Sequence, residues 1–279
     1  MNYPTITHVK RNTDPFNMDQ RHYHNQYEIY YLLNGERNYF INQRSYHVKK
    51  GDLVLINKNI LHKTVTIDKK KPEHERILIQ FNEELFANFK SEMNSLKLFA
   101  IFNQQNVLSL NPEQQLWLEE HLFKLTAEKE KKDKDANLFY LKLMIAELLI
   151  FIKRISNKSA AQNLKYPDQK HKNISRVAAY INDNYHKKLS LKMLANKFNY
   201  SSAYLSRAFK EVTGFNFVEY KNNVRIKEAS KLLQQTSLSV TEISGRVGFN
   251  NITHFGRIFK EFTDLSPLEY RKVRSYKIK

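Results

Sequence analysis

The sequence of 279 residues contains no cysteine, and only six glycines and six prolines. The absence of cysteine excludes disulfide scaffolds, iron–sulfur clusters and thiolate-ligated zinc, and it is typical of a reducing compartment, so we expect a cytoplasmic location. Average usage would give about 20 glycines in a chain of this length. We therefore expect each glycine to lie where a turn or a close approach requires it.

Long apolar runs are also missing. The longest, residues 143–152, is interrupted by Glu147 and is too short to span a bilayer. The first fifteen residues lack the apolar stretch of a signal peptide. The sequence therefore predicts no membrane partner, while a hydrophobic content of 41% is enough for a core and excludes global disorder.

Acidic residues are fewer than basic residues. The chain has 46 Lys and Arg against 28 Asp and Glu, a net charge of +18. Residues 168–279 carry 21 basic and 9 acidic side chains, a net charge of +12, whereas residues 1–167 carry 25 and 19. A strongly basic C-terminal third is the electrostatic footprint of an anionic partner such as nucleic acid.

The first two thirds of the chain change from a strand pattern to a helix pattern. Residues 20–81 hold short runs of Val, Ile, Tyr, Phe and Thr between polar turns, which predicts an antiparallel sandwich or barrel. Two amphipathic helices follow, at about 111–132 and 135–156, and form a predicted helical hairpin. This hairpin can cover the sheet, mediate dimerisation, or do both.

Residues 157–171 have few large apolar groups and include Pro167, so they predict a linker. The predicted organisation is a first domain at 1–156, a linker at 157–171 and an all-helical domain at 172–279.

The basic third contains an internal repeat. Residues 205–220 recur fifty positions later as residues 255–270, with seven identities in sixteen positions. Residues 191–200 correspond to 240–249, so the second copy has one extra residue in or near its turn. Each copy has the pattern of helix, short turn, helix.

The second helix of each copy has one apolar face and one face of small residues and cations. Such a face suits the major groove of DNA, because small side chains allow close approach and arginine offers paired donors to guanine or phosphate. We expect Lys210 and Lys260 to contact phosphates or acidic neighbours rather than bases. Some of these cations could instead be solvated surface groups. The candidate DNA contacts are Ser202, Ala203, Ser206, Arg207 and Lys210 in the first copy and Asn251, Ile252, Thr253, Arg257 and Lys260 in the second, with Gly256 on the same exposed face.

About 100 residues of the basic third carry a fixed set of spacings. They include Leu194, Tyr204, Leu205, Ser206, Arg207, Phe209, Lys210, Gly214, Arg225, Ile226, Ala229, Leu232, Leu233, Glu242, Ile243, Gly248, Phe249, Phe255, Arg257, Phe259, Lys260, Ser266, Pro267, Tyr270 and Arg271. In these spacings the sequence resembles the AraC family of bacterial transcription regulators. The resemblance implies two helix-turn-helix units joined by a long helix at about 217–235, with recognition helices that enter successive major grooves ~34 Å apart. Ser244 and Asp264 depart from the family pattern, where alanine and a helix-ending glycine are usual.

A second constellation lies in the strand-rich part. It reads His22-x-His24-x3-Glu28-x6-Gly35 and Gly51-x5-Asn57-x-Asn59-x2-His62. These segments resemble the two motifs of a cupin barrel, with Asn57 and Asn59 in place of the usual proline and glycine. In metal-binding cupins, the positions equivalent to His22, His24, Glu28 and His62 ligate the metal, and such a set suits Zn, Fe, Mn or Ni.

The same residues can serve an effector rather than a metal. In AraC-type sensory barrels, metal is generally not part of the mechanism, and such histidines bind a small molecule or bond within the barrel. Alternate residues of a strand share a face, so Tyr30 is expected to point inward beside Glu28. The candidate effector contacts are His22, His24, Glu28, Tyr30, Arg44 and His62, and no cofactor is expected unless a divalent metal occupies the four ligand positions.

Together these features predict an α+β protein: an N-terminal cupin-like β-barrel with a helical hairpin, and a C-terminal all-α domain with two helix-turn-helix units. The expected function is that of a sequence-specific transcriptional regulator, an activator that responds to a sugar-like metabolite. Its expected partners are promoter DNA, RNA polymerase and a second copy of the chain. The alternative is a cupin enzyme, a metal-dependent oxygenase or isomerase using His22, His24, Glu28 and His62. The complete DNA-reading repeat argues against that alternative, and no catalytic residue is predicted.

Overall fold

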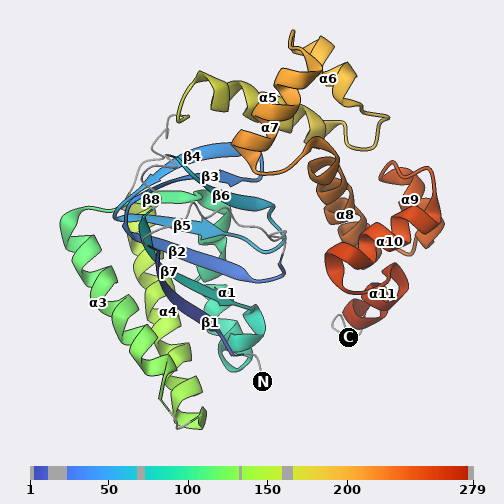
Figure 1. Cartoon of the computed structure of the whole chain (residues 1–279). Coiled ribbons are helices and arrows are strands. Elements are labelled where there is room, and N and C mark those ends of the chain that lie inside the picture. The colour runs from blue at the N-terminus through green and yellow to red at the C-terminus, as the bar shows by residue number, and fades with distance from the viewer. Residues whose placement is uncertain (1–2, 12–23, 68–72, 132–133, 159–165, 276–279) are drawn as a thin grey trace. The chain divides into compact units, whose positions relative to one another are not determined.

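The computed structural model describes residues 3–11, 24–67, 73–131, 134–158 and 166–275 (Figure 1). These residues divide into two compact units, one made mainly of residues up to 158 and the other mainly of residues from 166 onward. No helix among the described residues has the length and apolar character that crossing a membrane requires. The domain limits expected from the sequence stay a prediction.

The strands of the N-terminal part form two antiparallel sheets. One sheet has five strands in the order β1-β7-β2-β5-β8, and the other has three in the order β4-β3-β6. The strands are β1 (Thr5–Arg11), β2 (Tyr27–Asn34), β3 (Glu36–Ile41), β4 (Arg44–Lys49), β5 (Asp52–Ile56), β6 (His62–Thr66), β7 (His74–Phe81) and β8 (Val107–Ser109).

The two faces of the five-stranded sheet pack against different partners. On β2, the odd-numbered residues Ile29 and Tyr31 belong to a core shared with the helical hairpin. Tyr30 and Leu32 point the other way, into a core shared with Tyr39 of the three-stranded sheet. This alternation follows from the two-residue period of a strand. The even-numbered face of β2 therefore lines the space between the sheets.

The described strands of the cupin-like domain do not close into a continuous barrel. The chain instead crosses between the two sheets at its turns, for example from β2 to β3 at Gly35. Gly35 has a φ of +87°, and an added Cβ would lie 2.5 Å from the carbonyl oxygen of Glu73. Only glycine fits this crossing without strain. The expected cupin-like barrel is thus present as two packed sheets that the described strands leave open.

Helices cover the outer face of the five-stranded sheet (Figure 1). The hairpin helix α3 begins at Pro112 with Asn111 as its cap, where the side chains of Asn111 and Gln114 each accept from the other's backbone. Such a reciprocal cap satisfies two backbone donors at the helix start. The helices of this part are η1 (Glu83–Phe89), α1 (Lys90–Ser95), η2 (Leu98–Ala100), α2 (Ile101–Gln104), α3 (Pro112–Lys129) and α4 (Lys134–Lys158).

The C-terminal part consists of helices. They are α5 (Gln169–Asp183), α6 (Leu191–Lys197), α7 (Ser202–Thr213), α8 (Phe217–Gln235), α9 (Val240–Arg246), α10 (Ile252–Thr263) and α11 (Pro267–Ser275). In Figure 1, α8 runs between the pair α6–α7 and the pair α9–α10. The α+β class and the two helix-turn-helix units are therefore confirmed.

Candidate functional site

The two recognition helices are built in the same way. Ser201 caps α7 by accepting from the Tyr204 amide, and Asn251 caps α10 by accepting from the His254 amide. Both helices end in a residue with left-handed backbone, Gly214 in α7 and Asp264 in α10. A side-chain cap at the start and a left-handed residue at the end define the length of each helix.

The turns before these helices also repeat. The Tyr200 amide donates to the Ala195 carbonyl at 2.8 Å, and the Phe249 amide donates to the Ser244 carbonyl at 2.9 Å. The positions correspond at an offset of 49 residues, while the helix caps correspond at 50, so Asn250 is the extra residue of the second copy. The repeat in the sequence is thus a repeat in structure.

One turn position requires glycine in the second copy. Gly248 has a φ of +91°, and an added Cβ would lie 2.6 Å from the carbonyl oxygen of His186. The equivalent residue of the first copy, Asn199, is also left-handed, with a φ of 58°. The second turn is therefore the more tightly packed of the two.

Each recognition helix packs its apolar face inward. Leu205, Phe209 and Val212 of α7 are buried, and Phe255 and Phe259 of α10 are buried as well. Phe209 meets Tyr220 edge-on at 5.3 Å, and Phe259 meets Tyr270 edge-on at 5.4 Å. The opposite faces of both helices are consequently left to solvent.

The candidate DNA contacts all lie on these opposite faces. The residues exposed to solvent are Ser202, Ala203, Ser206, Arg207 and Lys210 of α7, the cap residue Asn251, and Ile252, Thr253, Arg257 and Lys260 of α10. Arg257 lies 3.9 Å from Glu261 of the same helix, a surface pair of little energetic weight. Two small, basic faces of this kind can enter the grooves of duplex DNA.

Helix α8 connects the two helix-turn-helix units. Its 19 residues span about 28 Å. The buried Arg225 ties α8 to the preceding loop, because its Nε donates to the Tyr185 carbonyl and one terminal nitrogen to the Lys187 carbonyl. This arginine has a structural role inside the domain.

A second cluster lies between the two sheets, around the carboxylate of Glu28. The Glu28 side chain is fully buried and accepts from Tyr39 at 2.9 Å and from Gln80 at 2.8 Å. His24 Nε2 lies 3.1 Å from one of its oxygens, and His62 Nε2 lies 3.5 Å from the same oxygen. Burial alone would raise the pKa of Glu28, but the two histidines outweigh it and hold that pKa well below its usual range.

The two histidines are oriented by backbone carbonyls. His24 Nδ1 donates to the Gln26 carbonyl at 3.1 Å, and His62 Nδ1 donates to the Ile60 carbonyl at 2.8 Å. Their Nε2 atoms are thereby turned toward Glu28. Carbonyl-bound histidines with the other nitrogen facing inward are typical of metal ligands, and the ligand atoms of His24, Glu28 and His62 all lie within 4.8 Å of one another.

Further polar groups extend this cluster along the space between the sheets. The Tyr30 hydroxyl is buried and has no hydrogen-bond partner among the described residues, and burial raises its pKa to about 12. The Arg76 guanidinium lies 5.5 Å from the Tyr30 ring. The fully buried Arg37 donates to Thr66 at 2.7 Å. The interior is therefore a polar site rather than a plain hydrophobic core.

The candidate effector residues differ in how they relate to this interior. His24, Glu28, Tyr30 and His62 lie in it, whereas His22 falls outside the described residues. Arg44 opens β4, and its guanidinium lies 4.8 Å from the centre of the Tyr166 ring rather than in the cluster around Glu28. The sequence motifs did not indicate Arg37, Arg76, Tyr39 and Gln80, although Arg37 has the same strand parity as Tyr39 and a buried arginine in a strand is itself a signal.

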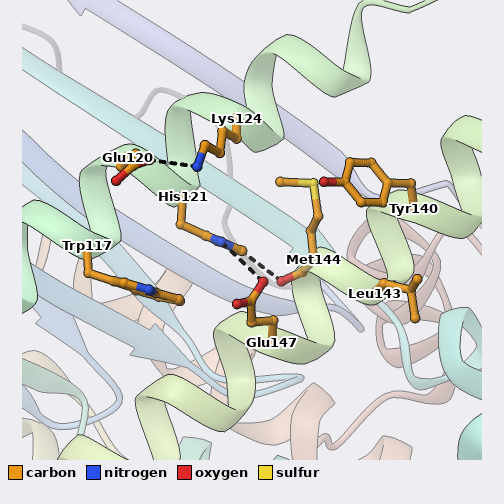
Figure 2. Close-up of a pocket in the computed structure, with 8 residues that line it drawn as sticks. All are labelled: Trp117, Glu120, His121, Lys124, Tyr140, Leu143, Met144 and Glu147. Atoms are coloured by element: carbon orange, nitrogen blue, oxygen red, sulfur yellow. Dashed lines mark hydrogen bonds and ion pairs between the residues drawn. The ribbon is translucent and has the colours of Figure 1, made fainter.

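The helical hairpin carries a separate pocket. A pocket of about 220 Å³ is lined by residues of α3 and α4, and Figure 2 shows their side chains. The Trp117 ring stacks on His121 at 4.8 Å, and His121 Nε2 donates to the Met144 carbonyl at 2.9 Å. Lys124 pairs with Glu120 on the rim at 2.6 Å. Around the pocket, Tyr140 and Leu143 remain 49% and 44% exposed.

Comparisons with known families match both parts of the chain. A family model described as AraC-like ligand binding domain matches residues 4–139. A second model, described as Helix-turn-helix domain, matches residues 194–273. Together the two models cover most of the chain and correspond to its two compact units.

Curated relatives are named as regulators. The Msm operon regulatory protein of Streptococcus mutans is 26% identical over 247 residues, which is 88% of this chain and 84% of that protein. The uncharacterized HTH-type transcriptional regulator YisR of Bacillus subtilis is 29% identical over 136 residues, which is 49% of this chain and 45% of that protein. YdiP of Escherichia coli is 35% identical over 99 residues, which is 36% of this chain and 33% of that protein. The match therefore covers less than half the length of YisR and of YdiP.

Solved structures also match. The C-terminal domain of AraT, a response regulator from Geobacillus stearothermophilus, is 31% identical, covers 38% of this chain and 89% of that chain, and has a TM-score of 0.37. ToxT from Vibrio cholerae is 13% identical, with coverage of 97% and 98% and a TM-score of 0.38.

Proposed function

The chain belongs to the AraC family of transcriptional regulators, and we propose that it controls transcription from the cytoplasm by binding promoter DNA through α7 and α10. The observation that carries the proposal is the pair of recognition helices, which share caps, turns and buried faces and expose small, basic faces. The candidate contacts divide by type. Arg207 and Arg257 read base edges, while Lys210 and Lys260 contact phosphates.

The effector site is the polar interior between the sheets. We assign effector contacts to Glu28, Tyr30, His24 and His62, and add Arg37 from the structure. The Tyr30 hydroxyl is buried without a hydrogen-bond partner in the part of the chain that the structure describes. This supports a polar ligand, because burying such a group costs free energy unless a hydrogen bond satisfies it. Hydroxyl groups of a sugar-like metabolite would match the mixture of carboxylate, phenol and imidazole groups.

A divalent metal is the alternative occupant of this interior. His24, Glu28 and His62 would hold it, since two imidazoles and a carboxylate suit Zn, Fe, Mn or Ni. Such an ion would supply charge and a coordination site for an oxygen-bearing effector. Metal analysis of the purified protein distinguishes the two occupants.

The regulator is proposed to act as a homodimer and as an activator. The pocket and exposed apolar side chains of the hairpin support self-association, because a two-fold axis would bring Tyr140 and Leu143 against their own copies. Contact with RNA polymerase and activation follow from the family resemblance.

The proposal is tested by selecting binding sites for the full chain from a random pool of DNA duplexes. We expect enrichment of a defined sequence that binds about a thousandfold or more tightly than unselected duplex. The affinity should also fall steeply as salt rises, because bound cations on DNA are released. Failure to enrich any sequence, or equal affinity for selected and unselected duplexes, would contradict the proposal.

A further inference from the structure

Two helical glycines in the second repeat are required neither by backbone conformation nor by close packing against the described residues. Gly245 lies in α9 and Gly256 lies in α10. Neither has a φ in the left-handed range, and an added Cβ at either position would meet no described residue within 4 Å. Glycine inside a helix is destabilising relative to alanine, so its presence needs another reason.

The position of Gly256 supplies such a reason. It lies one helical turn after Ile252 and Thr253 and one turn before Lys260, half-buried at the edge of the face that α10 exposes. Arg257, the candidate base contact, is its immediate neighbour. The buried residue Phe259 lies one turn after it, on the flank of the apolar face. An added side chain at Gly256 would meet no described residue within 4 Å and would lie beside the exposed residues of α10.

The first copy differs at the equivalent position. Ser206 of α7 corresponds to Gly256 at the offset of 50 residues, and it is exposed with its Cβ on the matching face. Arg207 and Lys210 correspond to Arg257 and Lys260. The two recognition helices thus present the same cations, but only the second lacks a Cβ between them.

We propose that Gly256 determines how closely α10 approaches DNA. The backbone of α10 would pack directly against the duplex at this position, whereas the side chain of Ser206 would separate the backbone of α7 from the duplex. This inference rests on the proposed DNA-binding function. Under it, Gly256 is a positioning residue: it lets Arg257 reach base edges by removing the atom that would hold the helix away. The second unit then makes the tighter steric fit to its part of the site.

The test compares Gly256→Ala with the matched control Gly245→Ala in the full chain. Both variants should melt about 2–4 °C higher than the wild type, because alanine favours the helix and neither Cβ meets a neighbour. Binding to the selected duplex is then measured by fluorescence anisotropy. Gly256→Ala should lose on the order of fivefold or more in affinity, as an extra methyl in a packed interface does, while Gly245→Ala should bind like the wild type.

Two further variants, Gly256→Leu and Arg257→Ala, test whether a loss of affinity comes from the bulk of the side chain at position 256. Gly256→Leu should lose more affinity than Gly256→Ala while the chain still folds. Unchanged DNA affinity in both Gly256 variants would overturn the proposal, as would an equal loss in Gly245→Ala. Arg257→Ala separates this failure from a failure of the proposed function: if Arg257→Ala weakens binding and Gly256→Ala does not, only the close approach is wrong. If neither substitution matters, α10 does not contact the DNA.

Discussion

At the scale of single residues, the most constrained group of the described chain is Glu28. Its carboxylate has no exposed surface and is surrounded by Tyr39, Gln80, His24 and His62. A buried carboxylate is stable only when donors and positive charge offset its lost hydration. The network therefore fixes the geometry of the polar interior before any ligand enters.

Replacing this carboxylate tests the network. Glu28→Gln should lower the free energy of unfolding by about 2 kcal/mol or more at neutral pH, because an amide cannot accept from all of these donors. The pKa of Glu28 is held below its usual range in the folded state, so its contribution is present above the ordinary carboxyl pKa and is lost as pH falls through the folded value. Urea unfolding at several pH values measures both effects.

The control is Glu36→Gln. Glu36 also pairs with a histidine, His47 at 2.7 Å, but its side chain is 55% exposed. Such a surface pair contributes at most about 1 kcal/mol. Equal stability changes in the two variants would show that the Glu28 network adds nothing beyond a surface ion pair.

Residue-level prediction from sequence succeeded where strand parity applied. Tyr30 and Glu28 lie on one face of β2, as alternation requires. His24 precedes β2 and reaches Glu28 from a loop. The alternation of side chains along a strand does not predict the direction of a side chain in a loop. Arg37 and Gln80 were missed because their role depends on which strands face each other, and no local pattern encodes that.

At the scale of elements, the helical hairpin has two different faces. The inner residues Leu118, Leu122 and Ile145 are fully buried against the sheet. The outer residues Tyr140 and Leu143 stay exposed beside the Trp117 pocket (Figure 2). A hairpin needed only as a cover would have a polar outer face.

The proposed dimer predicts a specific effect of charge on this outer face. Leu143→Asp should weaken self-association about tenfold or more. The change removes a leucine side chain that the proposed dimer would bury, and it places a carboxylate in the interface, where the carboxylate would lose its hydration. Leu96→Asp is the matched control, since Leu96 is 45% exposed and Leu143 is 44% exposed. Sedimentation equilibrium measures both, and a wild-type chain that stays monomeric, or equal effects of the two changes, would contradict the dimer.

Most elements were predictable from local pattern, and the exceptions have physical reasons. The strands between residues 27 and 81 were expected to within a few residues because alternation and turns mark them. Strand β8 has only three residues, too few for a periodic signal. Strand β1 lies at the edge of its sheet and is rich in polar residues, so its sequence carries a weak strand signal. It pairs with β7, from which the strands β2 to β6 separate it along the chain.

At the scale of the whole molecule, a polar sensory interior and a DNA-reading repeat occupy separate compact units. The net charge follows this division, since residues 168–279 carry 21 basic and 9 acidic side chains. Control of DNA binding by an effector requires that the effector bind two arrangements of the chain with different affinity. The repeat provides two helices of the same build, α7 and α10, that expose small, basic faces.

The most direct test of the account is the effect of Arg207→Ala and Arg257→Ala on binding of the full chain to its selected duplex, with each base pair varied in turn. Each substitution should cost about 1–3 kcal/mol and relax specificity at its own base pairs, and the two sets of base pairs should lie about one helical turn apart. Unchanged affinity in both variants, or relaxed specificity at the same base pairs, would contradict two recognition helices in successive grooves.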